Sequence, residues 1–309
     1  MLRDLNRYID YTVYFKLICV ALLWGGTFVA GRVIAVEIPA QIAALIRFII
    51  ASILLIMLIY LKEGSLPKLN KYQLGITAIM GLTGVCIYNL SFFTALAYMP
   101  ASRTALFVSM SPILTLITAR LFFKEQLSYL NYCGVILALF GTFIVITKGQ
   151  LFSQLHQSFS YGEWMMLIAV GSWVIYTLCA KFIPTVSSLG MITYSTLWGT
   201  FFLFLATFTQ LDAITTLKID FSIWMALFYL GSFATVLAFI WYAEGIQKIG
   251  ATRTIVFNYL VPLFAVLLAY FILNENISPS MFIGGVLSFV GVLMTNKKHI
   301  QKPSSKKGT

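Results

Sequence analysis

The stretch ASRTALFVSMSPILTLITARLFFKEQLSYLNYCGVILALFG, residues 101–141, occurs a second time at residues 251–291 as ATRTIVFNYLVPLFAVLLAYFILNENISPSMFIGGVLSFVG. The two copies are 150 residues apart throughout and align without a gap. Matches between Leu, Val and Ala mean little in so apolar a chain, but other pairs are more informative: Arg103 and Arg253, Thr104 and Thr254, Phe107 and Phe257, Pro112 and Pro262, Glu125 and Glu275, Ser128 and Ser278, Gly134 and Gly284, and Gly141 and Gly291. We therefore expect the chain to contain an internal duplication.

The composition indicates an all-α integral membrane protein. Of the 309 residues, 60% are hydrophobic and only 10% are charged, whereas soluble proteins carry roughly 25% charged residues. Apolar runs of about 18 to 25 residues recur along the chain, and each is long enough for a helix that crosses a hydrocarbon core of roughly 30 Å. The alternation of apolar and polar residues that is typical of a membrane β-barrel is absent. We therefore expect the lipid bilayer to be the environment of this chain.

The apolar runs divide into ten segments, which we expect to be transmembrane helices: Tyr14–Ile34, Ala40–Leu61, Tyr72–Tyr98, Ser102–Phe123, Leu130–Thr147, Glu163–Phe182, Leu189–Thr209, Ser222–Gln247, Thr252–Leu273 and Met281–Asn296. We expect the first segment to be retained as a helix, because its apolar run of about 20 residues exceeds the roughly 7 to 15 of a signal-peptide core.

The positions of Lys and Arg predict the orientation in the membrane. With the N-terminus in the cytoplasm, fifteen of the 21 Lys and Arg residues fall on the cytoplasmic side and four on the other, while Arg47 and Arg120 lie within the membrane. Cytoplasmic loops carry such an excess of basic residues. We therefore expect a multi-pass protein of the plasma membrane, the inner membrane in a bacterium, with both termini in the cytoplasm. This topology also explains the net charge of +11, so we expect no nucleic-acid partner.

The number of helices in each half predicts how the two halves are related. Five is an odd number, so the second half enters the membrane from the side opposite to the first, and the repeats are inverted. We expect a first five-helix repeat at residues 14–147, an external linker at 148–162, a second repeat at 163–296 and a basic cytoplasmic tail at 297–309.

Polar residues at helix ends have structural interpretations. Four hydroxyl residues stand where N-caps are expected: Ser102, Ser128, Thr252 and Ser278. Glu125 and Glu275 lie three residues before Ser128 and Ser278, where a helix dipole favours a carboxylate. Glu244 lies four residues before Lys248, which favours an ion pair at the end of the eighth helix.

Glycines recur seven residues apart in the fifth and tenth helices. Gly134 with Gly141, and Gly284 with Gly291, place small residues on one face of each helix. Such faces allow close approach of helices in membranes. We expect these two helices to pack closely, either within one chain or across a homodimer.

Two prolines lie near the middle of the membrane. Pro112 and Pro262 are each the eleventh residue of their segments, and a proline inside a helix removes a hydrogen bond and kinks or breaks it. Broken helices related by inverted repeats are typical of transporter binding sites near the midplane. A passive kink that only serves packing is the alternative.

Arg47 is the most informative charge within a predicted span. It lies eight residues into the second helix, roughly 12 Å deep at 1.5 Å per residue, and an arginine at a helix centre costs about 2.5 to 3.5 kcal/mol on insertion scales. Its side chain either extends to the surface or caps helix ends, or it holds a substrate carboxylate or another anion. Asn89 and Asn258 offer uncharged hydrogen-bonding groups at similar depth.

Aromatic residues are frequent in the same region. They serve packing or interface anchoring, or they contact a ligand, and Asn258 and Tyr259 favour the second interpretation because they lie within one turn of Pro262. We expect a substrate-binding site formed by polar and aromatic residues, namely Arg47, Asn89, Asn258, Trp24, Tyr88, Trp173, Tyr176, Trp241 and Tyr259.

Sequence signatures of enzymes do not occur in this chain. It has no H-E-x-x-H motif, no P-loop and no G-x-S-x-G motif. The four cysteines lie in apolar runs without C-x-x-C spacing. We therefore expect no catalysis, no metal site and no cofactor.

The chain resembles the EamA family of the drug/metabolite transporter superfamily over about residues 14–296. The features that carry the resemblance are the ten helices in two repeats, the mid-helix prolines, the loop glutamates that lead into glycine helices, W-G-G-T-F at Trp24–Phe28, and the A-x-R-T opening of the fourth and ninth helices. The resemblance implies a transporter of small metabolites, often an exporter of amino acids or related compounds, with a central cavity lined by both repeats.

We therefore expect a carrier that moves a small metabolite, best an amino acid or a related zwitterion, out of the cell by alternating access. All ten acidic residues can be placed in loops, tails or helix ends, which favours facilitated export or exchange over proton coupling through a buried carboxylate. A carrier of nucleotide-like or other anionic metabolites, or a channel, is the alternative.

Overall fold

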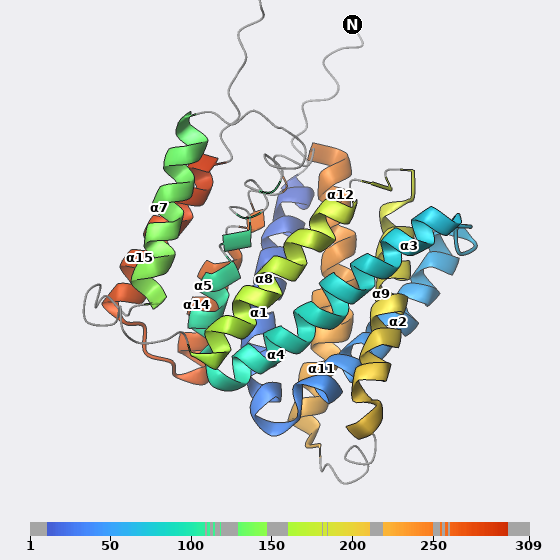
Figure 1. Ribbon diagram of the computed structural model, residues 1–309, viewed down its shortest axis with the longest axis horizontal. Coiled ribbons are helices and arrows are strands. Elements are labelled where there is room, and N and C mark those ends of the chain that lie inside the picture. Colours follow the sequence, from blue (N-terminus) through green and yellow to red (C-terminus); the bar gives the residue numbers. More distant parts are fainter. Residues whose placement is uncertain are drawn as a thin grey trace, which may run out of the picture.

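The computed structural model describes residues 11–108, 110, 111, 114, 118, 129–146, 160–180, 182, 183, 185–210, 219–249, 254, 257, 258 and 260–295. These residues are predominantly helical, and they contain no strand. Figure 1 shows the helices packed side by side as one bundle.

Among the described residues, six helices are long and apolar enough to cross a membrane. They are α1 (Tyr11–Glu37), α2 (Ala40–Glu63), the continuous run of α3 (Lys71–Met80), η1 (Gly81–Ile87) and α4 (Tyr88–Tyr98), α8 (Tyr161–Ala180), α9 (Ser188–Thr207) with η2 (Phe208–Gln210), and the run of α11 (Phe221–Gly231), η3 (Ser232–Leu237) and α12 (Ala238–Ile249). Each coincides with a span expected from the sequence.

Four further helices lie in the ranges of the remaining expected spans: α5 (Ala101–Val108), α7 (Tyr129–Ile146), α14 (Leu260–Leu273) and α15 (Pro279–Thr295). In the described residues, the apolar part of each of these helices is shorter than the 18 residues or more of the six helices above. The structure therefore supports an all-helical membrane protein with six clear spans.

Local sequence signals explain several helix ends. Asn70 and Gln73 form a reciprocal capping box at the start of α3, with both hydrogen bonds at 2.9 Å. Ser187 caps α9 by accepting from the Gly190 amide at 3.0 Å. The predicted cap at Ser278 is confirmed, because its hydroxyl accepts from the Met281 amide at 3.3 Å, at the start of α15.

The closest helix pairs combine the two halves of the chain. The most extensive contacts are made by α7 with α15, α1 with α14, α4 with α8, and α2 with α9. In every pair one helix comes from the first half and the other from the second. The buried core continues across these contacts and includes Phe28, Phe48, Phe92 and Phe93.

The pair α7 and α15 lies at one edge of the bundle (Figure 1) and packs through glycine. A Cβ atom placed on Gly141 would lie 2.5 Å from the Gly284 carbonyl oxygen, and one on Gly291 would lie 2.6 Å from the Gly134 carbonyl oxygen. The contact is thus reciprocal between positions that are 150 residues apart. These glycine faces meet within one chain, the first of the two arrangements expected from the sequence.

Two π-helical segments interrupt long helices. They are η1 and η3, which begin at Gly81 and Ser232. A Cβ on Gly81 would lie 2.7 Å from the Gly199 amide of α9, and a Cβ on Gly231, which directly precedes η3, would lie 2.9 Å from the Arg47 carbonyl oxygen of α2. Glycine thus lets each π segment lie against a helix of the other half, and π-bulges are frequent at functional sites.

Candidate functional site

Arg47 lies in the interior of the bundle, where two helices supply its hydrogen-bond acceptors. Its side chain is only 9% exposed. Nη1 donates to the Asn89 side-chain oxygen at 2.9 Å, and Nη2 donates to the Thr235 hydroxyl at 3.3 Å. The guanidinium also lies 5.1 Å from the centre of the Phe48 ring, a cation–π distance. The structure therefore places Arg47 inside the protein and not at its surface.

The π segments orient both acceptors. The Asn89 amide nitrogen donates to the Val85 carbonyl in η1 at 2.8 Å, which turns its oxygen towards Arg47. The Thr235 hydroxyl donates to the Leu230 carbonyl, five residues earlier, at 2.7 Å, so its lone pairs face the guanidinium. Each acceptor is thus held by a backbone carbonyl that lies in or beside a π segment.

Both partners of Arg47 are neutral, and its positive charge has no ion-pair partner among the residues that the structure describes. The ion pairs seen there join other residues: Lys16 with Glu244, Lys248 with Glu244, and Arg103 with Glu163. The Arg47 Nε is buried and has no hydrogen-bond acceptor. Buried N–H groups in folded proteins nearly always have an acceptor, so the Arg47 Nε is a donor that a bound anion can use.

An aromatic cluster includes Tyr88, the residue directly before Asn89. Tyr88 stacks on Phe92 with ring centres 5.8 Å apart and lies 5.3 Å from Trp173, which in turn stacks on Tyr176 at 5.0 Å. Tyr88 and Phe92 come from α4, and Trp173 and Tyr176 come from α8. Three predicted site residues, Tyr88, Trp173 and Tyr176, therefore form one cluster between these helices.

A second aromatic cluster surrounds Trp24. Its ring lies 5.1 Å from Tyr242 and 5.7 Å from Phe239, and its Nε1 donates to the Ala234 carbonyl of η3 at 3.0 Å. Asn258 joins this cluster, because its amide nitrogen donates to the Tyr242 hydroxyl at 3.2 Å. Trp24 and Asn258 are thus brought together through Tyr242.

The remaining predicted site residues are less closely connected. Trp241 lies on α12 and makes no ring contact or hydrogen bond with either cluster among the described residues. Pro262 lies in the first turn of α14, which begins at Leu260. Tyr259 and Pro112 are outside the described residues. Their roles stay predictions.

Sequence reasoning missed Thr235, Phe48 and Tyr229. Tyr229 fills the space beside Gly26, where a Cβ would lie 2.3 Å from its hydroxyl, and it donates to the Leu23 carbonyl at 2.6 Å. The available signals were weak: a lone threonine close to Gly231, and two adjacent glycines after Trp24 that have no obvious use in a helix.

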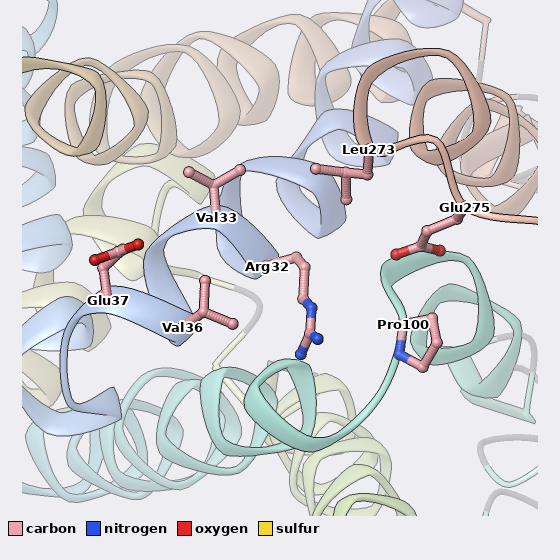
Figure 2. A pocket seen from close by; sticks show the side chains of 7 residues that line it. All are labelled: Arg32, Val33, Val36, Glu37, Pro100, Leu273 and Glu275. Carbon is pink, nitrogen blue, oxygen red and sulfur yellow. The ribbon is translucent and has the colours of Figure 1, made fainter.

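A pocket of about 400 Å³ lies near the beginning of α5, away from Arg47. Figure 2 shows its lining, with Arg32 in the middle and the carboxylates of Glu37 and Glu275 on opposite sides. Arg32 donates to the Leu96 carbonyl at the end of α4. Glu275 accepts from the backbone amides of Ala101 at 2.8 Å and Ser102 at 3.0 Å.

These bonds correct two predictions from the sequence. Glu275 caps α5 and not the nearby α15, because α14 packs against α5 and directs the residues that follow it there. Ser102 is no N-cap, since α5 begins one residue earlier, at Ala101, and its hydroxyl donates to Glu275. The predicted pair of Glu244 with Lys248 is confirmed at 3.1 Å, and Lys16 joins it at 2.7 Å.

Comparison with known proteins gives a family match over most of the chain. The model of the EamA-like transporter family matches residues 12–147 and 160–297. The uncharacterized transporter YyaM of Bacillus subtilis is 27% identical over 283 residues, covering 91% of this chain and 92% of its own. YetK, an uncharacterized transporter of the same organism, is 27% identical over 288 residues, covering 91% and 86%.

A more distant relative is named for a transport activity. It is a probable terminal-alkyne amino-acid exporter of Streptantibioticus cattleyicolor, 22% identical over 227 residues, covering 73% of this chain and 74% of its own. One solved crystal structure has a TM-score of 0.64 at 17% identity, covering 92% of this chain and 97% of its own. At that identity the likeness concerns the fold alone.

Proposed function

Because the chain belongs to the EamA-like transporter family, we propose that it carries a small metabolite, best an amino acid or a related zwitterion, out of the cell by alternating access. The family and its relatives are transporters, and we propose a carrier with no catalytic role. The observation that carries this proposal is the buried Arg47 with only neutral partners.

The proposed architecture is ten spans in two inverted repeats, residues 14–147 and 163–296, joined by an external linker at 148–162 and followed by a basic tail at 297–309. Three observations support it. The family model matches the chain twice. The glycine contacts between α7 and α15 are reciprocal at an offset of 150 residues, and the π segments begin at nearly the same offset, at Gly81 and Ser232.

The proposed orientation places both termini in the cytoplasm of a cell whose plasma membrane, or bacterial inner membrane, holds the protein. The basic residues then lie mainly inside. In this orientation the pocket beside Glu275 faces outwards, and the cluster of Lys16, Glu244 and Lys248 faces the cytoplasm. Cysteine labelling from either side tests the orientation.

The proposed substrate site lies around Arg47. Its guanidinium would hold a carboxylate, Asn89 and Thr235 would keep it in place, and the aromatic clusters of Tyr88 and Trp24 would contact the apolar part of the substrate. The amino-acid exporter of S. cattleyicolor supports a substrate of this class. No carboxylate pairs with Arg47 among the residues that the structure describes, which favours facilitated export or exchange.

A homodimer stays an untested proposal, as do the absence of a nucleic-acid partner and of a cofactor. The glycine faces that could have formed a dimer are already used between α7 and α15. A dimer would therefore need another surface.

Counterflow tests the proposed function. Proteoliposomes preloaded with one unlabelled amino acid at a time are given the labelled compound outside, and nucleotide derivatives are tested in the same way. We expect transient accumulation of at least one amino acid and its loss in Arg47→Ala. Accumulation of nucleotide derivatives only would favour the alternative anionic carrier. Flux that neither saturates nor responds to the compound inside would indicate a channel.

A further inference from the structure

We infer that the site around Arg47 recognises its substrate through the carboxylate alone, so that it binds 2-hydroxy acids and other monocarboxylates at least as tightly as the corresponding amino acids. This inference rests on the proposed function, because it takes the Arg47 cluster as the substrate site.

The first argument is the charge of the cluster. Arg47 is 9% exposed and its two hydrogen-bond acceptors are neutral. A charge inside a protein at membrane depth is costly unless another charge compensates it. A bound monocarboxylate would bring the net charge of the cluster to zero, whereas a zwitterion would leave it at plus one. The cluster therefore favours a ligand with a net negative charge.

The second argument is the number of donors on Arg47. A guanidinium has five N–H donors, and the structure uses one on Nη1 and one on Nη2. Nε is buried and has no acceptor. The edge formed by Nε and one Nη can bind both oxygens of a carboxylate, the geometry that makes arginine selective for this group. The bonds to Asn89 and Thr235 would meanwhile hold the guanidinium in place.

The third argument is that, in the described part of the chain, no carboxylate pairs with the Arg47 cluster, where it could receive an ammonium group. The chain has ten Asp and Glu residues, and those that the structure describes in ion pairs are bound to Lys16, Lys248 and Arg103. The aromatic clusters proposed to contact the substrate, Tyr88 with Trp173 and Trp24 with Tyr242, offer ring faces to an ammonium group. Cation–π contacts with such rings contribute about 0.5 to 2 kcal/mol, so an ammonium group is tolerated but not required.

Tryptophan fluorescence of the purified full-length protein tests the inference independently of transport, because Trp24 and Trp173 belong to the clusters around the site. The protein in detergent at pH 7 is titrated with three related compounds. L-phenyllactate carries only the carboxylate, L-phenylalanine carries both the carboxylate and the ammonium group, and L-phenylalaninamide carries only the ammonium group. L-lactate serves as a smaller carboxylate. We expect phenyllactate to bind at least as tightly as phenylalanine and at least tenfold more tightly than phenylalaninamide.

Variants of α2 then assign the effect to Arg47. In Arg47→Gln we expect at least a tenfold loss of affinity for phenyllactate and no loss for phenylalaninamide, while Arg47→Lys should keep part of the preference. Lys62→Gln is the matched control, because it removes the same charge from the exposed end of the same helix. Phenyllactate binding in Lys62→Gln should equal that of the unmodified protein.

Several results would overturn the inference. One is that phenylalaninamide binds as tightly as phenyllactate or more tightly, and another is that phenyllactate binding is unchanged in Arg47→Gln. A third is that neither phenyllactate nor lactate gives a signal. The last is that chloride gives a signal that phenyllactate does not displace. If carboxylates bind but no compound shows counterflow, the proposed transport fails and the binding inference stands. If amino acids are exchanged but their hydroxy acids neither bind nor compete, the proposed transport stands and the binding inference fails.

Discussion

The Arg47 guanidinium donates to the side-chain oxygen of Asn89 across 2.9 Å, in the interior of the bundle, although the two residues are 42 positions apart in the chain. The Asn89 amide is itself held by the Val85 carbonyl of a π segment. A carboxamide at this position satisfies one donor of Arg47 without neutralising its charge. The pair therefore leaves the positive charge of Arg47 uncompensated by Asn89.

Replacing Asn89 by aspartate should inactivate the protein without unfolding it. Asn89→Asp puts a carboxylate of nearly the same shape beside Arg47, and the resulting buried ion pair competes with the carboxylate of the substrate for the guanidinium. We expect amino-acid counterflow below about a tenth of the normal rate. This corresponds to a loss of roughly 1.4 kcal/mol or more in the free energy of substrate binding. The midpoint of thermal unfolding should be equal or higher.

Asn70→Asp is the control for this substitution. Asn70 caps α3 at an exposed position, and aspartate can make the same hydrogen bond to the Gln73 amide. Counterflow should be unchanged in this variant. Normal transport by Asn89→Asp would show that the charge of Arg47 has no part in substrate binding.

Neutralising Glu275 should loosen the first turn of α5. In Glu275→Gln a single amide oxygen replaces the carboxylate that binds the Ala101 and Ser102 amides. Loss of a helix cap of this kind costs about 0.5 to 2 kcal/mol. We expect faster hydrogen–deuterium exchange in a peptide that covers residues 99–108.

Glu37→Gln provides the comparison for Glu275, because Glu37 lines the same pocket but makes no hydrogen bond to α5 among the described residues. Exchange in residues 99–108 should not change in this variant. Equal exchange in both variants would mean that the cap contributes nothing to the stability of α5.

The sequence predicted the helical membrane fold because span length and apolar composition are properties of single segments. The range Tyr14–Ile34, for example, lies within α1 (Tyr11–Glu37). Arg47 and Asn89 were recognisable in the same way, since a charge or an amide is unusual at that depth. The family resemblance is confirmed by the match to the EamA-like model.

Contacts between distant segments were not predictable in this way. Thr235 reaches Arg47 because α11 approaches α2 at Gly231, and a glycine four residues before a threonine does not indicate which helix approaches. The partner of Glu275 was predicted wrongly for a related reason. Proximity in the chain suggested α15, whereas the packing of α14 against α5 brings a different helix N-terminus to its carboxylate.

Adding a methyl group to Gly141 should separate α7 from α15. The new Cβ would lie 2.5 Å from both the Gly284 carbonyl oxygen and the Ser288 amide nitrogen, which are backbone atoms that cannot turn aside. Overpacking of this kind costs about 1 to 3 kcal/mol. We expect Gly141→Ala to lower the midpoint of thermal unfolding in detergent.

Gly171→Ala is the matched control for Gly141→Ala. A Cβ on Gly171 of α8 would meet no atom within 4 Å, and alanine favours a helix over glycine by about 0.5 to 1 kcal/mol. This variant should keep or raise the unfolding midpoint. If both variants unfold at the same temperature, close packing through Gly141 is not a source of stability.

Removing the indole N–H of Trp24 should affect the π segment η3. Trp24→Phe keeps an aromatic ring next to Tyr242 and Phe239 but deletes the donor to the Ala234 carbonyl. Hydrogen bonds of this kind between membrane helices are worth roughly 0.6 to 2 kcal/mol. We expect faster hydrogen–deuterium exchange in η3 and a lower rate of counterflow, because Thr235 belongs to η3 and holds Arg47.

Trp224→Phe, a change at an exposed tryptophan of α11, should alter neither quantity. Unchanged exchange in η3 of Trp24→Phe would show that the π segment keeps its geometry without this donor.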